Sequence, residues 1–279
     1  MQKTKTKVKD YMIFIILLVL AILFLSPIFI VLMNSFKGKF YISDMPFLFP
    51  DSTTFAGFKN YTSGMEKIGF MSAFGMSLFI TVCSVAVIIL FTSMTAWYIT
   101  RVKSKFTSIM FYVFVSSMIV PFQMVMFTMT KVANIIHLDN PVGIILIYLG
   151  FGSGLSVFLF SGFVKSIPIE IEEAVMIDGC NPVQSFFKVV FPILKPTAIT
   201  VAILNVMWIW NDYLLPYLVI GTEYKTIPIA IQYLKGGYGS IDMGAMMAML
   251  VLAIVPIVIF YLACQKYIIE GVVAGAVKG

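Results

Sequence analysis

Long apolar runs alternate with short polar segments along the whole chain. Each run has more than about 20 residues, which is the length that a helix needs to cross the roughly 30 Å apolar core of a bilayer. The charged side chains lie between the runs, with the single exception of Asp212. The pattern therefore predicts six membrane-spanning helices, over residues 11–33, 72–99, 106–130, 142–164, 197–220 and 243–264.

The composition supports a membrane protein. Of the 279 residues, 60% are hydrophobic and only 11% are charged, whereas about 25% of the residues of a soluble domain are charged. This excludes a soluble enzyme, because too few polar side chains are present to cover a surface in water. Cys83, Cys180 and Cys264 are too widely spaced for a disulfide framework or a metal site. We expect one all-α integral membrane domain over residues 1–279.

The distribution of basic residues predicts the orientation of the spans. If the N-terminus is inside, the inner segments carry most of the 19 Lys and Arg residues. An excess of positive charge marks the cytoplasmic loops of membrane proteins. Both termini are therefore expected to face the cytoplasm.

Polar and aromatic residues gather near the outer end of the fifth run. An ionised carboxylate at the centre of a membrane helix costs roughly 2.5–3.5 kcal/mol, so Asp212 calls for a partner or a function. Its neighbours Trp210, Asn211 and Tyr213 offer the mixture of groups that suits the hydroxyls and C–H faces of sugars. We expect these four residues, with Gln123 of the third run, to line a translocation path. Two alternatives stay open, because Asp212 can lie among headgroups or pair with another protein, and membrane glutamines also join helices.

The segment of residues 166–192, between the fourth and fifth runs, has the pattern of two short helices. Pro168 followed by glutamates predicts the start of the first helix, and Gly179 can adopt the left-handed backbone that ends it. Asn181 as N-cap and Pro182 at the first position predict the start of the second. We therefore expect this segment to form a compact knob beside the bundle.

The second of these helices is expected to be amphipathic and to end at Pro192. Apolar residues at i, i+3, i+4 and i+7 form one face, made of Val183, Phe186, Phe187 and Val190. Such a face can pack on the chain's own helix ends or lie among lipid headgroups. The first helix is acidic, however, whereas helices at a membrane surface are usually rich in Lys and Arg. A protein partner is therefore the favoured interpretation.

Three groups of residues in this segment have a characteristic spacing: Glu173-Ala174-Val175, then Gly179, then Val189-Val190-Phe191-Pro192. The spacing resembles the E-A-A, x3, G, x9, I-x-L-P loop of the permeases of binding-protein-dependent ABC importers. It departs at Val175, Val189 and Phe191, where alanine, isoleucine and leucine are usual. The resemblance covers nearly the whole chain and is closest to the maltose-type carbohydrate permeases. Supporting stretches are residues 60–61, 96–101, 120–123, 177–179, 210–216 and 271–279.

The resemblance implies a permease subunit of an ATP-driven oligosaccharide importer in the bacterial cell membrane. It implies a homologous second permease, two ATPase subunits and an extracytoplasmic solute-binding protein as partners. The chain has no G-x-x-x-x-G-K-[ST] phosphate loop, so ATP and Mg²⁺ are expected on the ATPase subunits and no cofactor on this chain. In this family the loop forms coupling helices in a cleft of the ATPase. This implies coupling roles for Glu173, Ala174, Asp178, Gly179, Phe186, Phe187 and Pro192.

Other functions fit the pattern less well. An intramembrane hydrolase needs a base beside its nucleophile or two close carboxylates, but the single histidine, His137, falls in a loop and Asp212 is the single acidic residue within the runs. An ion-coupled secondary transporter with Asp212 as proton site lacks internal symmetry and further ionisable groups. An ABC permease for a non-sugar solute, such as a glycerol phosphoester, stays open because the separate binding protein largely sets selectivity in this family.

Overall fold

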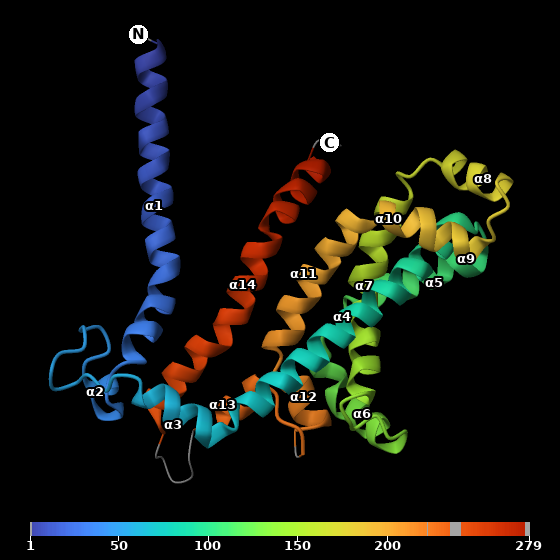
Figure 1. Ribbon diagram of the computed structural model, residues 1–279. Coiled ribbons are helices and arrows are strands. Elements are labelled where there is room, and N and C mark those ends of the chain that lie inside the picture. The colour runs from blue at the N-terminus through green and yellow to red at the C-terminus, as the bar shows by residue number, and fades with distance from the viewer. Residues whose placement is uncertain (1, 222, 235–240, 277–279) are drawn as a thin grey trace. The chain divides into compact units, whose positions relative to one another are not determined.

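In the computed structural model, residues 2–221, 223–234 and 241–276 are described, and they fold into helices joined by turns and short loops (Figure 1). Their bounds are α1 (Gln2–Asn34), α2 (Lys39–Asp44), α3 (Lys59–Ile68), α4 (Phe70–Arg101), α5 (Lys105–Ser117), α6 (Phe122–Ile135), α7 (Gly143–Val164), α8 (Ile169–Ile177), α9 (Pro182–Ser185), the π-helix η1 (Phe186–Val190), α10 (Phe191–Ile193), α11 (Lys195–Asn211), α12 (Leu214–Val219), α13 (Ile227–Gln232) and α14 (Met243–Ala276).

Four of the helices in the described ranges are long and apolar enough to cross a membrane. They overlap the first, second, fourth and sixth predicted spans, and each of them is one continuous helix. The all-α membrane fold predicted from the sequence is likewise confirmed. The four segments are Lys9–Asn34, Phe70–Arg101, Gly143–Val164 and Met243–Tyr267.

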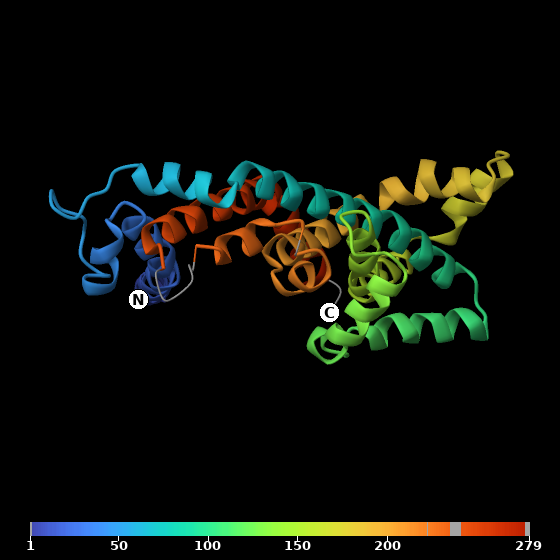
Figure 2. The ribbon, with the colours of Figure 1, turned by 90° about the horizontal axis from the view of Figure 1, so that it is seen from below.

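The third predicted span, residues 106–130, is not one continuous helix. α5 ends at Ser117, α6 begins at Phe122, and the two are bent by 107° (Figure 2). Pro121 explains the break, because it has no N–H to donate and disfavours helical backbone in the residue before it. The apolar run of residues 106–130 therefore contains a turn between two helices.

The fifth predicted span, residues 197–220, is also interrupted. α11 ends at Asn211, and Asp212 has extended backbone with ψ of 125° before α12 begins at Leu214. At its other end, α11 is bent by 74° from the helical segment Pro182–Ile193. The acidic residue in the apolar run thus lies at a break and not within a helix.

The chain divides into two compact units, one made of Met1–Phe70 with Ala230–Val255 and the other of Met71–Ile229 with Pro256–Gly279. In the first unit, side chains tie the loop after α1 in place. The Asn60 amide donates to the carbonyl oxygens of Ser35 and Lys37 at 2.7 and 2.8 Å. The Ser35 and Tyr61 hydroxyls are also hydrogen-bonded, at 2.7 Å.

Two acidic side chains of the first unit hold its polar turns. Asp51 accepts hydrogen bonds from the Thr53 hydroxyl and from the Thr54 amide and hydroxyl. These bonds stabilise the ionised carboxylate and lower the pKa of Asp51 to about 2. Asp242, just before α14, forms an ion pair with Lys67 of α3.

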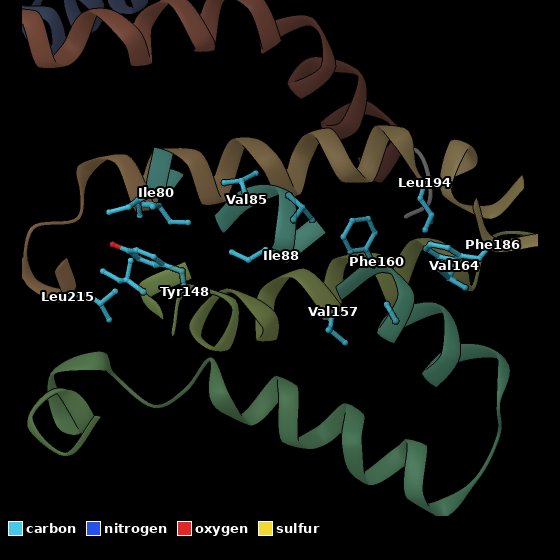
Figure 3. Packing of buried hydrophobic residues seen from close by; sticks show 14 of the residues in the cluster. Ile80, Val85, Ile88, Tyr148, Val157, Phe160, Val164, Phe186, Leu194 and Leu215 are labelled. Atoms are coloured by element: carbon cyan, nitrogen blue, oxygen red, sulfur yellow. The ribbon is translucent and has the colours of Figure 1, made fainter. Parts of the chain in front are cut away.

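The second unit has a hydrophobic core built around α7. Both α5 and α11 pack on α7, and fully buried side chains fill the space between these helices and α4 (Figure 3). Ile88 of α4 and Phe160 of α7 are examples. Gly154 permits the close approach of α5, because a Cβ there would lie 2.7 Å from the Phe114 carbonyl oxygen. The core therefore fixes α4, α5, α7 and α11 as one framework.

Candidate functional site

The predicted knob is present as α8, α9, η1 and α10, and its capping residues act as expected. α8 begins directly after Pro168. It ends in a Schellman motif, in which Gly179 has a left-handed φ of +86° and the Cys180 amide donates to the Val175 carbonyl oxygen. The backbone position of Gly179 would strain any residue with a Cβ.

The second short helix starts at the predicted cap. Asn181 accepts from the Gln184 amide at 2.9 Å, while the Gln184 side chain accepts from the Asn181 amide at 3.1 Å. This is a reciprocal capping box. Helical structure runs on through Pro192 to Ile193 before the bend into α11, so the predicted end is correct to within one residue.

The end of α8 and the turn after it face away from the rest of the chain. Glu173, Ala174, Asp178 and Gly179 are all exposed, and Ile177 is 85% exposed. These residues lie within seven consecutive positions, so one edge of the knob presents two carboxylates beside a large apolar side chain. A surface of this kind suits a protein partner with basic groups around an apolar recess.

The predicted apolar face of the second helix is wrong in part. Phe187 and Val183 are exposed, but Phe186 is 1% exposed and Val190 is fully buried. The reason is the packing of the π-helix at 186–190 against α4, where the Phe186 ring lies 5.4 Å from Trp97. Phe186 therefore belongs to the core and cannot contact a partner in this conformation, whereas Phe187 and Pro192 remain at the surface.

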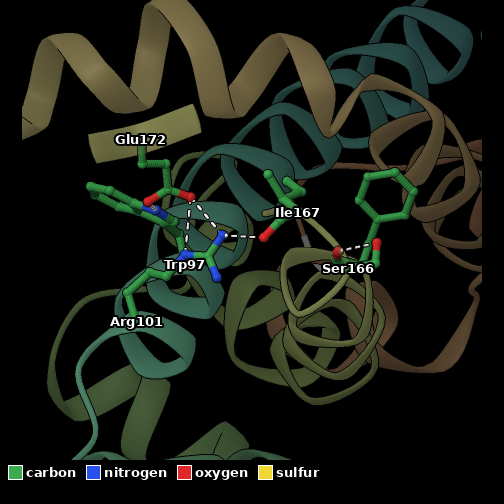
Figure 4. Close-up of polar contacts among 6 residues, drawn as sticks. Trp97, Arg101, Ser166, Ile167 and Glu172 are labelled. Carbon is green, nitrogen blue, oxygen red and sulfur yellow. Dashed lines mark hydrogen bonds and ion pairs between the residues drawn. The ribbon is translucent and has the colours of Figure 1, made fainter. Parts of the chain in front are cut away.

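A buried polar cluster attaches α8 to the end of α4 (Figure 4). Glu172 is 4% exposed, and its Oε1 accepts from Nε and Nη2 of Arg101 at 3.0 and 2.7 Å. Its Oε2 accepts from the Trp97 indole N–H at 2.9 Å. Arg101 also donates to the Ile167 carbonyl oxygen at 3.0 Å. Ser166 closes the end of α7 through a bond to the Phe163 carbonyl oxygen.

Sequence reasoning missed Glu172 and assigned the coupling role to its neighbour, Glu173. A signal was present in the spacing of Trp97 and Arg101, since residues four apart share one face of a helix. The Trp97 indole and the Arg101 guanidinium group are hydrogen-bond donors at the end of an apolar span, so a nearby acceptor is expected. Which of the nearby glutamates supplies it could not be read from the sequence.

The residues predicted to line a path are close in sequence but differ in environment. Asp212 accepts from the Tyr148 hydroxyl at 3.1 Å and from the Leu214 and Leu215 amides at 3.0 and 3.4 Å. It therefore caps α12 and links it to α7. Tyr213, beside it, stacks on Tyr217 with ring centroids 5.1 Å apart.

The other predicted path residues point elsewhere. Trp210 is 5% exposed and packs edge-on against Phe74, so its ring is part of the core. Asn211 is exposed and donates to the Met207 carbonyl oxygen of its own helix. Gln123 is exposed on the first turn of α6. The structure thus brings Asp212 and Tyr213 together but not these three with them.

A cavity of about 300 Å³ lies between α5, α7 and α11 and contains none of the five predicted path residues. Asn205 and Trp208 line it with Ser117 and Gly152. Asn205 is 4% exposed and donates to Ser156 at 3.3 Å. This cavity could not be predicted from the hydrophobic pattern, because it lies at the break between α5 and α6.

The described residues contain no group of three or more His, Cys, Asp or Glu that could hold a metal ion. The polar clusters in the second unit therefore consist of ion pairs and hydrogen bonds among protein groups.

Comparisons with known proteins identify relatives along the whole chain. Residues 88–273 match the family model described as "Binding-protein-dependent transport system inner membrane component". The chain is 39% identical to the probable starch degradation products transport system permease protein AmyC of Thermoanaerobacterium thermosulfurigenes, over 98% of this chain and 99% of that protein. It is 34% identical to the multiple sugar-binding transport system permease protein MsmG of Streptococcus mutans, over 99% and 100%.

The fold is similar to that of a solved transporter chain. A chain from a bacterial ABC transporter that imports the acidic polysaccharide alginate superposes with a TM-score of 0.75. The superposition covers 94% of this chain and 96% of the other at 21% sequence identity. This likeness extends the match to the three-dimensional arrangement.

Proposed function

Since the chain belongs to the family of binding-protein-dependent transport system inner membrane components, we propose that it is the membrane-spanning permease subunit of an ATP-driven carbohydrate importer. It forms the translocation path together with a homologous second permease. The knob of α8 to α10 docks on an ATPase subunit and passes the motion of that subunit to the spans. The observation that carries this proposal is the exposed edge from Glu173 to Gly179, held at the end of the bundle by a buried anchor.

The proposed cargo is a sugar or an oligosaccharide. Two relatives at 34% identity or more are named for starch degradation products and for multiple sugars. Asp212 and Tyr213 supply a carboxylate and an aromatic ring at a break in the helix. Gln123 and Asn211, both exposed, are proposed to contact the solute at places apart from this break, and the buried Trp210 supports the break from the core.

The proposed assembly contains two ATPase subunits, which bind ATP and Mg²⁺, and an extracytoplasmic solute-binding protein. The description of the family as binding-protein-dependent supports this last partner. The chain lies in the bacterial cell membrane with both termini in the cytoplasm. The knob then also faces the cytoplasm, where the ATPase is found.

Docking can be tested at Gly179. Replacing Gly179 by valine strains the left-handed turn and changes the angle between α8 and α9. We expect the chain to insert normally but uptake to fall at least tenfold, while Gly162→Ala, at a helical glycine with open space around it, leaves uptake unchanged. Normal assembly with the ATPase and normal uptake by Gly179→Val would contradict the docking role.

The cargo can be tested by uptake in proteoliposomes that contain the complete importer. We expect ATP-dependent uptake of labelled maltotriose or of another oligosaccharide, and Asp212→Asn should lower it at least fivefold without changing the amount of inserted chain. Uptake of glycerophosphocholine but of no sugar would overturn the carbohydrate assignment. Uptake that survives loss of the ATPase and stops when the ion gradient is dissipated would favour an ion-coupled transporter.

A further inference from the structure

We propose that Trp97, Arg101 and Glu172 form a joint that transmits the displacement of α8 to α4, so that these three side chains position the coupling segment and Glu173 contacts the ATPase. The inference rests on the proposed docking of the knob. It assigns different tasks to two adjacent glutamates. The experiments below separate a failure of the joint from a failure of docking.

The first observation is that α8 has little other attachment to the bundle. Along α8, every residue of which the structure describes, Glu172 alone is buried and Val175 alone is half-buried. α8 packs mainly on α9 and η1, which are parts of the same knob. A force applied to the exposed edge of α8 therefore reaches the spans through Glu172, through the second short helix, or through the short link to α7, where Arg101 also binds the Ile167 carbonyl oxygen.

The second observation is the geometry at Glu172. Both of its carboxylate oxygens are occupied, one by two N–H groups of Arg101 and the other by the Trp97 indole. The guanidinium group is planar and holds its donors in a fixed fork, so the contact resists rotation as well as separation. Burial excludes water, which would otherwise compete for the same bonds.

Trp97 and Phe186 add a packing contact to the polar joint. The indole lies against the Phe186 ring, with centroids 5.4 Å apart, and Phe186 is 1% exposed. The same side chain on α4 thus holds α8 by a hydrogen bond and η1 by ring contact. Both halves of the knob are therefore fixed to α4 at one place.

The third observation is that α4 extends from the joint into the hydrophobic core. Arg101 is the last residue of this 32-residue helix, and Ile88 lies further back, within the core. Ile88 is packed so closely on Gly152 of α7 that a Cβ at Gly152 would lie 2.7 Å from it. Gly152 and Asn205 line the 300 Å³ cavity. A displacement of α4 at Arg101 is therefore transmitted through a rigid, close-packed helix to the wall of this cavity.

The direct test measures coupling in the complete importer, reconstituted in proteoliposomes with its ATPase subunits, binding protein and maltotriose. Glu172→Gln keeps the size of the side chain and removes its charge. We expect the variant to assemble with the ATPase and to hydrolyse ATP within about twofold of the wild-type rate. Uptake per ATP hydrolysed is expected to fall at least tenfold. Glu170→Gln, on the exposed side of the same helix, is the matched control and should couple normally.

Glu173→Ala distinguishes the joint from docking. This variant is expected to lose association with the ATPase, because it changes the exposed edge and leaves the joint intact. If Glu173→Ala and Gly179→Val both behave as wild type, the proposed docking is wrong. If Glu173→Ala loses the ATPase but Glu172→Gln transports with normal coupling, docking stands and the joint is overturned.

A second variant covers the case in which Glu172→Gln fails to insert. Trp97→Phe removes one hydrogen bond and keeps a ring beside Phe186, so we expect normal insertion and an intermediate loss of coupling of about threefold. A cysteine at Ser117, on the cavity wall, reports the motion in a background without Cys83, Cys180 and Cys264. Its alkylation rate should change with ATP in the parent and not in Trp97→Phe or Glu172→Gln. A normal ATP-dependent change in Trp97→Phe, together with normal coupling, overturns the joint.

Discussion

Two carboxylates of the second unit, Glu172 and Asp212, are held within the protein in different ways. Glu172 is bound by a cation and an indole that lie on another helix, far away in sequence. The three donors to Asp212 are neutral, and two of them are amides that follow it directly in the chain. The first contact joins separate elements, whereas the second mainly completes the start of a short helix.

This difference sets how sensitive each site is to substitution. Removal of one partner from a buried ion pair leaves an uncompensated charge away from water, which is costly. Removal of a neutral donor from Asp212 leaves other donors in place, and the side chain is only half-buried. We therefore expect large effects at the Glu172 site and moderate ones at the Asp212 site.

The largest effect is expected for Arg101→Met. It should lower the free energy of unfolding by about 3–5 kcal/mol, because the Glu172 carboxylate stays buried without its cation. Thermal or denaturant unfolding of the purified chain in detergent measures this change. The double variant Arg101→Met/Glu172→Met should recover most of the loss, since an apolar pair can replace a buried ion pair. A cost below about 1 kcal/mol for the single variant would contradict the assignment.

A smaller effect is expected for Asp212→Ala. It removes the cap of α12 and the acceptor of the Tyr148 hydroxyl, which should lower the free energy of unfolding by about 1–2 kcal/mol. Asn211→Ala is the control, because its exposed side chain bonds only within its own helix among the described contacts. Equal costs for the two variants would show that Asp212 has no capping role.

Tyr148→Phe should cost about 1 kcal/mol, the typical value of one neutral hydrogen bond. The ring would keep its edge-to-face contact with Trp208, at a centroid distance of 5.5 Å. Unfolding of the single variants and of the pair with Asp212→Ala gives a double-mutant cycle. Additive costs in that cycle would exclude direct coupling between the two side chains.

The smallest effect is expected for Lys67→Ala in the first unit. Its ion pair with Asp242 is exposed, with 52% of the Lys67 side chain accessible, so the change should be below about 1 kcal/mol. Salt screens such pairs, and the difference from wild type should vanish at about 1 M salt. A loss as large as that of Arg101→Met would mean that burial does not explain the contrast between the charged sites.

Local rules predicted the knob well. Pro168, Gly179 and Asn181 each act within one helical turn of themselves, so their roles follow from backbone sterics and capping. The apolar runs likewise predicted the four long continuous helices, because the length needed to cross a bilayer is fixed. These features depend on neighbours in the chain and are readable from the sequence.

The features that the sequence did not predict depend on distant partners. Glu172 and Arg101 are 71 positions apart, and no local pattern distinguishes Glu172 from Glu173. Phe186 lies in an amphipathic pattern, but its contact with Trp97 turns it inward and divides the predicted face. The break at Asp212 was overlooked because a hydropathy pattern does not show that a carboxylate caps a new helix.

The separation between Arg101 and Glu172 also has a consequence for biogenesis. Arg101 is synthesised 71 residues before its carboxylate partner, so its guanidinium group lacks this partner while α5, α6 and α7 are made. The pair can close only after α7 has been threaded across the lipid and has brought Glu172 back to the same side. Formation of the Arg101–Glu172 ion pair therefore requires a correctly inserted chain. In a nascent protein with an inverted α7, the two charged side chains would stay on opposite sides of the membrane.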